Sequence, residues 1–192
     1  MNVLQTERLR IRHLVLDDLA DVHRTVYADP DVCRYYCGQT RTLEHTERWL
    51  RYRGYESVDT EFGLMAVTRL QEGDLLGLCG LQPYVGHWLL LEGEPEQQTY
   101  APLEIELNYA FGKAYWGRGY AHEVCLAMID YAFREQRLRR LVTGCHPENA
   151  RARRLQDRLG MRQVRNLHPR NPGTVGILDN LLAPQAGRRG SG

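Results

Sequence analysis

The residues Trp116-Gly-Arg-Gly-Tyr-Ala121 separate an alternating apolar stretch, Leu103 to Phe111, from a segment with apolar residues at helical spacing, Ala121 to Ala132. This order predicts a strand, a glycine-rich turn and a helix. Two glycines allow the backbone to turn tightly and to approach a ligand closely. The first N–H groups of a helix have no partner within the helix, so this turn favours an anion such as phosphate.

The loop departs from two other nucleotide-binding patterns. His122 stands where the Gly-x-Gly-x-x-Gly dinucleotide fingerprint has its third glycine, and no acidic residue matches at the end of the next strand. The Gly-Lys-Ser/Thr of a Walker loop is missing from the sequence. Taken alone, the loop also fits a plain turn between a strand and a helix.

The rest of the chain predicts further elements on the same reasoning. Strands are expected near residues 8–12, 62–69, 75–82 and 138–145, with weaker ones near 161–167 and 173–178. Helices are expected from Asp17-Asp18 to Asp29-Pro30-Asp31, near 42–53 with Leu43, Trp49 and Leu50 in the core, and from Pro147-Glu-Asn149 to Gly160. Residues 84–102 read as a long loop. Strands that alternate with helices indicate one α/β layered domain.

Length and composition narrow the class of protein. A chain of 192 residues predicts one domain, here residues 1–182, followed by a polar, glycine-rich tail at 183–192 that we expect to be disordered. No apolar run is long enough to span a membrane, and the N-terminus lacks the apolar core of a signal peptide, so we expect a cytoplasmic protein. The five cysteines suggest reduced thiols, and Cys33, Cys37 and His45 match no usual zinc spacing, so no metal is expected.

The charges are balanced overall but segregated along the chain. The net charge is +1, which gives no basic excess for nucleic acid. Residues 70–112 hold seven acidic residues and no Lys or Arg, whereas residues 134–165 hold ten arginines and three acidic residues. This pattern fits either two solvated faces or partners of opposite charge.

Seven short motifs follow one another along the chain in this order: Thr6-Glu-Arg-Leu-Arg-Ile-Arg12, Gly77-Leu-Cys-Gly-Leu81, Glu106-Leu-Asn-Tyr-Ala-Phe111, Tyr115-Trp-Gly-Arg-Gly-Tyr-Ala-His-Glu123, Tyr131-Ala-Phe133, His146-Pro-Glu-Asn149 and Leu159-Gly-Met161. Together they resemble the GNAT superfamily of acetyl-CoA-dependent N-acetyltransferases, and more closely its RimJ/RimL branch, which acetylates ribosomal-protein N-termini. The resemblance implies a mixed, mostly antiparallel sheet, splayed between the fourth and fifth strands, with helices on both faces. A homodimer is expected by analogy alone.

The resemblance also implies where acetyl-CoA binds. The loop would wrap the pyrophosphate of coenzyme A through Trp116, Gly117, Arg118, Gly119, Tyr120 and Ala121. The pantetheine arm would pair with the backbone of Tyr109, Ala110 and Phe111, and Asn149 would orient it. Asn149 also suits a helix N-cap without ligand contact. Arg151 and Arg154 would reach the nucleotide phosphates or remain solvated.

Amine attack on a thioester requires a neutral amine and therefore a general base. The resemblance implies a carboxylate on the strand before the loop, with Glu106 as first candidate and Glu104 as second. Two residues apart on a strand, they share a face, and like charges in proximity would raise one pKa. Ala152 stands where the RimL type has a serine, and residues 153–159 contain no tyrosine, so the general acid is left open.

We therefore expect acetyl transfer from acetyl-CoA to a primary amine by direct attack in a ternary complex. The acceptor would be a protein N-terminus, a polyamine or another small amine. A covalent route through Cys145-His146 is disfavoured because neighbours at a strand end point to opposite faces. The alternative is a non-catalytic acyl-CoA-binding regulatory module that kept the cofactor cleft.

Overall fold

One mixed sheet organises the computed structural model, which describes residues 3–54, 60–85, 91–92, 103–167 and 173–181. The sheet order is β1-β2-β3-β4-β5-β6-β8-β7, and every neighbouring pair is antiparallel except β5 and β6. The strands are β1 (Leu4–Gln5), β2 (Leu9–Arg12), β3 (Gly63–Arg69), β4 (Leu75–Val85), β5 (Leu103–Phe111), β6 (Arg140–Cys145), β7 (Arg162–Asn166) and β8 (Gly173–Asp179).

The sheet opens between β5 and β6. Strand β5 pairs with β4 along its whole length, from Val85↔Leu103 to Gly77↔Phe111. With β6 it shares a single parallel register pair, Glu106↔Val142. The two strands therefore separate beyond Glu106. They are the fourth and fifth of the strands expected from the sequence, so the predicted position of the splay is confirmed.

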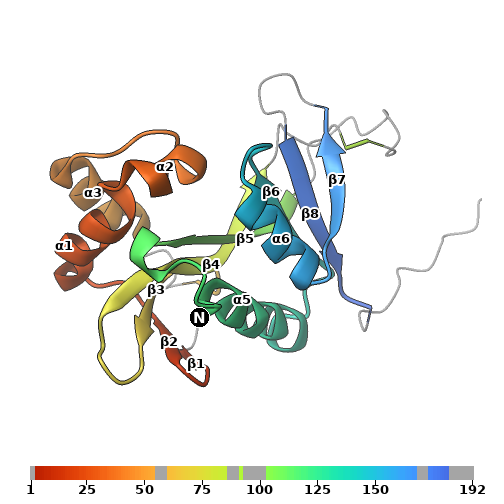
Figure 1. Ribbon diagram of the computed structural model, residues 1–192. Helices are drawn as coiled ribbons and strands as arrows, with labels where there is room; N and C mark the ends of the chain where they lie inside the picture. The colour runs from red at the N-terminus through yellow and green to blue at the C-terminus, as the bar shows by residue number, and fades with distance from the viewer. Residues whose placement is uncertain (1–2, 55–59, 86–90, 93–102, 168–172, 182–192) are drawn as a thin grey trace, which may run out of the picture.

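Helices cover both faces of the sheet, as predicted (Figure 1). The helices α1, α2 and α3 gather on one side, and α5 and α6 lie on the other. Their bounds are α1 (Leu19–Val22), α2 (Pro30–Tyr36), α3 (Leu43–Trp49), α5 (Tyr120–Asp130) and α6 (Ala150–Arg158). Helices α1, α3 and α5 continue into π-helical turns at His23–Tyr27, Leu50–Gly54 and Tyr131–Glu135, and short 3₁₀ turns occupy Leu16–Asp18 and Lys113–Tyr115.

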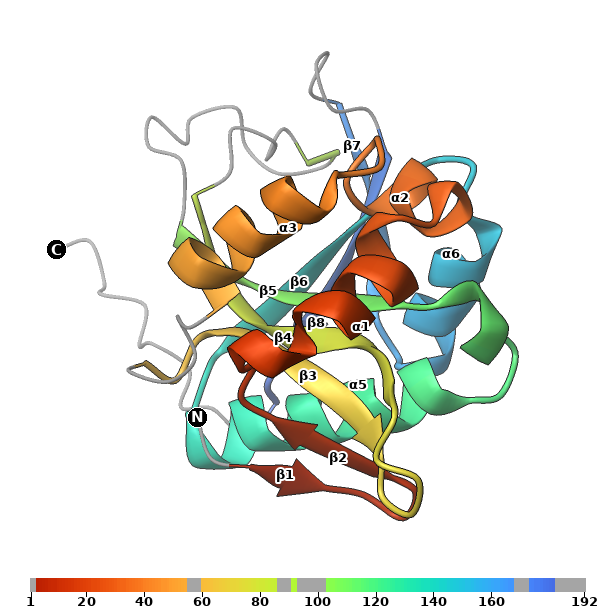
Figure 2. The same cartoon turned by 90° about the vertical axis from the view of Figure 1, so that its left-hand side faces the viewer.

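Side chains that alternate along the strands pack into two hydrophobic cores, one on each face of the sheet. In β3, Met65 and Val67 are buried on the side of α5, where they join Val124 and Met128. Successive strand residues point to opposite faces, so Leu64 and Ala66 are buried on the other side, with Val22, Val26 and Leu50. Figure 2 shows α1 and α3 lying over this second face. Two buried faces fix the register of the central strands and thereby the position of the β5–β6 opening.

The sequence reasoning missed α2. We expected Asp29-Pro30-Asp31 to end a helix, but the same residues also begin the next one. The Asp29 side chain accepts a hydrogen bond of 2.8 Å from the Asp31 N–H, and Pro30 occupies the first helical position. An N-cap aspartate followed by proline is a helix-start signal. The short strand β1 was missed as well.

The other elements follow the predictions closely, with one error in the core. Leu50 is fully buried as expected, whereas Leu43 is 50% exposed. The expected tail at 183–192 and most of the expected loop at 84–102 lie outside the described residues. Within that loop, Leu91 is buried and bridges Asn166. No helix among the described residues is long and apolar enough to cross a membrane.

Candidate active site

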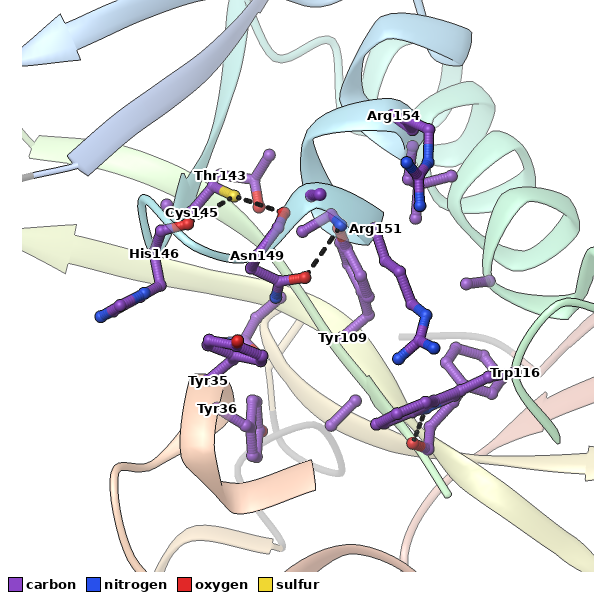
Figure 3. A pocket seen from close by; sticks show the side chains of 18 of the residues that line it. Tyr35, Tyr36, Tyr109, Trp116, Thr143, Cys145, His146, Asn149, Arg151 and Arg154 are labelled. Carbon is purple, nitrogen blue, oxygen red and sulfur yellow. Dashed lines mark hydrogen bonds between the residues drawn. The ribbon is translucent and has the colours of Figure 1, made fainter. Parts of the chain in front are cut away.

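A cavity of about 880 Å³ lies where β5 and β6 separate. Figure 3 shows side chains converging on it from α2, β5, β6, α6 and the glycine-rich loop. The candidate site residues in its lining are Glu106, Tyr109, Ala110, Phe111, Trp116, Gly117, Gly119, Tyr120, Ala121, Asn149 and Arg154. Two candidates, Glu104 and Arg118, are absent from the described lining.

The glycine-rich loop turns through two left-handed residues. Gly117 has φ +76° and Gly119 has φ +82°, conformations that side chains rarely adopt. Gly119 is the N-cap of α5, so the loop brings the unpaired N–H groups of a helix start to the cavity wall. The Trp116 indole N–H donates to the Phe111 carbonyl at 2.7 Å, which ties the loop to the end of β5. This arrangement suits a phosphate group.

An arginine from α6 stacks on this loop. The Arg151 guanidinium carbon lies 4.6 Å from the centre of a Trp116 ring, and Figure 3 shows its side chain reaching toward the indole. Arg154 also lines the cavity from α6. Helix α6 therefore adds positive charge on the side where the loop would hold an anion.

The start of α6 is built on Asn149. Its side-chain oxygen accepts a hydrogen bond of 3.1 Å from the Ala152 N–H, so Asn149 is the N-cap. The cap uses the oxygen of the amide, and Asn149 also lines the cavity. The two roles weighed for Asn149 are thus geometrically compatible. Ala152 lies in the first turn of α6 and brings a methyl group, not a hydroxyl, to the cavity wall.

The end of β5 leaves one backbone edge open. Tyr109, Ala110 and Phe111 pair with β4 on one side. Among the described residues, no strand pairs with their other side, because the register with β6 stops at Glu106. Buried backbone groups need hydrogen-bond partners, so this edge can accept an extended ligand.

Glu106 faces the cavity with uncharged partners. Its carboxylate accepts hydrogen bonds from the Asn108 side-chain amide at 3.3 Å and from the Gly144 N–H at 3.5 Å. Burial raises the pKa of Glu106, against the lowering effect of these two donors. The predicted cause, repulsion by Glu104, is wrong, because desolvation disfavours the charged form here.

Glu104 is placed differently. Its carboxylate is 6% exposed and forms a bidentate ion pair with Arg140 of β6. The pair holds β5 against β6 just before they separate. A carboxylate engaged in this way lies outside the cavity lining, so Glu106 is the carboxylate of β5 that faces a ligand.

The neighbouring Cys145 and His146 do not form a nucleophile pair. The Cys145 thiol contacts the backbone carbonyls of His146 at 3.4 Å and Asn149 at 3.5 Å, and burial raises the pKa of Cys145. The His146 Nδ1 accepts a hydrogen bond from the Glu148 N–H at 3.2 Å. Figure 3 shows the imidazole directed away from the sulfur. This geometry agrees with the expectation against covalent catalysis.

The sequence reasoning missed several cavity residues, among them Tyr35, Tyr36 and Asn108. Tyr35 and Tyr36 line the cavity from α2, an element that was not expected. Asn108 follows Glu106 by two residues, and this period-two spacing was the available signal for a side chain on the same face. The Asn108 side-chain oxygen is buried and has no hydrogen-bond partner among the described residues. It is free to accept a hydrogen bond from a ligand.

The comparison with protein families identifies the class. Residues 8–162 match the family model described as "Acetyltransferase (GNAT) domain". The match covers most of the chain, so the protein belongs to the GNAT acetyltransferase family and is an acyltransferase. Enzymes of this family use acetyl-CoA as co-substrate.

Individual relatives agree with this assignment. The chain is 27% identical to YkkB of Bacillus subtilis over 168 residues, which cover 88% of this chain and 90% of YkkB. An acetyltransferase structure from Agrobacterium tumefaciens superposes with a TM-score of 0.73 at 21% identity, covering 93% and 94% of the two chains. The ribosomal-protein-S5-alanine acetyltransferase of Vibrio fischeri has a TM-score of 0.66 at 13% identity, covering 96% of this chain and all of that one. At these identities the two structures show a shared fold.

Proposed function

We propose that the protein transfers the acetyl group of acetyl-CoA to a primary amine by direct attack in a ternary complex, with Glu106 as general base. The observation that carries this proposal is the placement of Glu106. Its carboxylate lies in the cavity beside the open edge of β5, against uncharged donors from Asn108 and Gly144. Burial raises the pKa of this carboxylate, which makes it a better proton acceptor.

The described residues fit acetyl-CoA in three places. The loop Trp116 to Ala121 presents helix N–H groups for the diphosphate, and Arg151 and Arg154 supply positive charge beside it. The open backbone edge at Tyr109, Ala110 and Phe111 offers partners to the amides of the pantetheine arm. Asn149 would hold the same arm through the amide nitrogen that its cap leaves available. Arg118 is absent from the described lining, so it would act on the diphosphate only through its positive charge.

The proposed reaction moves one proton from nitrogen to sulfur. The amine nitrogen attacks the thioester carbonyl, a C–N bond forms and the C–S bond breaks. Glu106 takes the proton from nitrogen and returns it to the leaving sulfur. A thiol has a pKa of about 8.5, so its thiolate leaves without a strong acid, which makes the alanine at position 152 tolerable. An N–H of the β5 edge, from Ala110 or Phe111, would stabilise the oxyanion.

For the acceptor we propose a protein N-terminus of the kind used by the RimJ/RimL branch, ahead of a polyamine or another small amine. The likeness to the ribosomal-protein-S5-alanine acetyltransferase supports this choice at the level of fold. Tyr35 and Tyr36 of α2 line the cavity, so an extended peptide end would have an aromatic surface on which to lie.

The decisive experiment is an acceptor panel with acetyl-CoA, in which release of free thiol is recorded. The panel contains peptides with N-terminal Ala and Ser, spermidine and an aminoglycoside. We expect thiol release with a peptide, together with mass spectra showing one added acetyl group at its N-terminus. Coenzyme A binding, seen as a raised Tm, without turnover on any acceptor would favour the non-catalytic binding module instead.

A further inference from the structure

The N-terminal segment Thr6–Arg8 lies against the outside of the glycine-rich loop. It joins β1 to β2, about 110 positions away from the loop in the sequence. Arg8 is the residue that makes the contacts. Nothing in the proposed reaction uses this segment, so its contacts call for a separate explanation.

Glu123, in the first turn of α5, is the anchor of this contact. Its carboxylate accepts hydrogen bonds from the Thr6 hydroxyl at 2.5 Å, the Arg8 backbone N–H at 3.0 Å and the Arg8 Nε at 2.7 Å. Burial would raise the pKa of Glu123, but these donors lower it below its ordinary value. The carboxylate therefore remains charged at neutral pH, and the link between the β1–β2 turn and α5 is charge-assisted.

From this anchor the Arg8 guanidinium reaches the loop itself. It donates from Nη1 to the Arg118 backbone carbonyl at 3.2 Å and lies 4.6 Å from the centre of the Tyr120 ring. Its Nη2 would be 3.5 Å from a Cβ built on Gly119. Arg8 thus contacts the two residues that flank Gly119 and lies next to Gly119 itself.

The Arg118 carbonyl decides which way the next N–H points. The peptide group between Arg118 and Gly119 is planar and trans, so its C=O and N–H point in opposite directions. When the carbonyl points to Arg8, the Gly119 N–H points away from Arg8. Gly119 lines the cavity, whereas Arg118 is absent from the described lining. Held this way, the peptide presents its donor to the cavity.

The contact with Arg8 matters because the Arg118–Gly119 peptide would otherwise be able to rotate. Rotation of this peptide changes ψ of Arg118 and φ of Gly119. Gly119 is left-handed here, and glycine populates both signs of φ with similar ease. A rotated peptide would turn its carbonyl oxygen, an acceptor, toward an anion. Preorganisation of the donor removes that ordering cost from ligand binding.

We propose that Arg8 is a positioning residue for the diphosphate of acetyl-CoA: anchored on Glu123, it fixes the Arg118–Gly119 peptide with its N–H toward the cavity. The inference rests on the proposed function, since it assigns the loop to the diphosphate. Arg8 itself touches no ligand in this arrangement and acts through the loop.

The test compares Arg8→Ala with Arg10→Ala, an exposed arginine of β2 two residues further along the chain. Both variants lose one positive charge, so long-range electrostatics are matched. The substrates are acetyl-CoA and S-acetylpantetheine, which lacks the diphosphate. For Arg8→Ala we expect the KM for acetyl-CoA and the Kd for coenzyme A to rise about tenfold, the effect of one charge-assisted hydrogen bond. We expect kcat, and kcat/KM for S-acetylpantetheine, to remain within about twofold of wild type.

Arg8→Lys is the second variant, in case Arg8→Ala does not fold. It keeps the charge and one donor, and we expect an intermediate KM for acetyl-CoA. Equal losses on both substrates, or Arg8 variants that behave like Arg10→Ala, would overturn the inference and leave the proposed function intact. Wild-type protein that neither binds coenzyme A nor consumes acetyl-CoA would overturn the proposed function and this inference with it.

Discussion

Two carboxylates on β5, two residues apart, differ in their surroundings. Glu104 is engaged by the Arg140 guanidinium, whereas Glu106 accepts hydrogen bonds from the uncharged Asn108 and Gly144. In the first arrangement the carboxylate is paired with a positive charge. The second leaves a carboxylate whose charge is disfavoured by burial.

The variant Glu106→Gln tests the proposed base. We expect kcat to fall about a hundredfold or more, since a general base contributes at least that much, and the Kd of coenzyme A to stay unchanged. Deprotonation of the acceptor amine raises kcat/KM at higher pH. In the wild type Glu106 also works when deprotonated, so kcat/KM should show an additional rise through its raised pKa. The pH–rate profile of the variant should lose this rise. Unchanged turnover in Glu106→Gln between pH 6 and 9 would remove Glu106 from the mechanism.

Asn108 offers an independent control of the same base. Its amide donates to Glu106 Oε2 and lowers the pKa of that carboxyl. Removing the donor in Asn108→Ala should raise the pKa of Glu106, so the acidic limb of kcat/KM should move to higher pH. Asn108→Asp should move it further, because a like charge disfavours ionisation. A limb that stays at its wild-type position in both variants contradicts the pairing.

At the scale of elements, α2 and α6 face each other across the opening of the sheet. Helix α6 starts at the Asn149 cap, and α2 starts at the Asp29-Pro30 cap. Each cap satisfies backbone N–H groups that would otherwise be unpaired next to the cavity. The local sequence of the caps therefore fixes where the walls of the site begin.

The two roles of Asn149 can be separated by substitution. Serine caps helices about as well as asparagine but lacks the amide nitrogen. For Asn149→Ser we expect an unchanged Tm and a raised KM for acetyl-CoA, measured by thermal unfolding and by initial rates. For Asn149→Ala we expect the same rise in KM and, in addition, a loss of about 1 kcal/mol in the free energy of unfolding. A wild-type KM in Asn149→Ser would leave capping as its role.

At the scale of the whole molecule, three acidic residues of the 70–112 stretch are paired with arginines among the described residues. Arg69 pairs with Glu72 and Asp74, and Arg140 pairs with Glu104 across the β5–β6 boundary. Several acidic residues of the 70–112 stretch are thus neutralised by arginines. The arginines of α6 beside the cavity remain as the feature that would attract an anionic cofactor.

Neighbouring arginines on α6 allow a matched test of this attraction. Arg154 lines the cavity, whereas Arg153 is absent from its described lining. We expect Arg154→Ala to weaken coenzyme A binding several-fold and to flatten the dependence of Kd on salt, because a charge contact to phosphate is screened by ions. Arg153→Ala should follow the wild type. Calorimetry at low and at raised NaCl concentration measures both, and identical salt dependence in the two variants would contradict a role for Arg154.

The sequence by itself determined most strands and helices and the glycine-rich loop before α5. These rest on local patterns, such as the period-two alternation of Leu103 to Phe111 and the left-handed positions that glycine fills. The resemblance to the family rests on the ordered set of motifs along the chain. The start of α2 is also encoded by a local signal, the N-cap Asp29 followed by Pro30, but we predicted the end of a helix at these residues.

Only the tertiary structure decided which side chains share an environment. It paired Glu104 with Arg140, left Glu106 facing the cavity and set Arg8 behind a loop about 110 residues away. Such contacts depend on strand pairing and helix packing between distant segments, and no local period encodes them. Burial and partner, the two quantities that set the pKa of a carboxylate, exist only once the chain has folded.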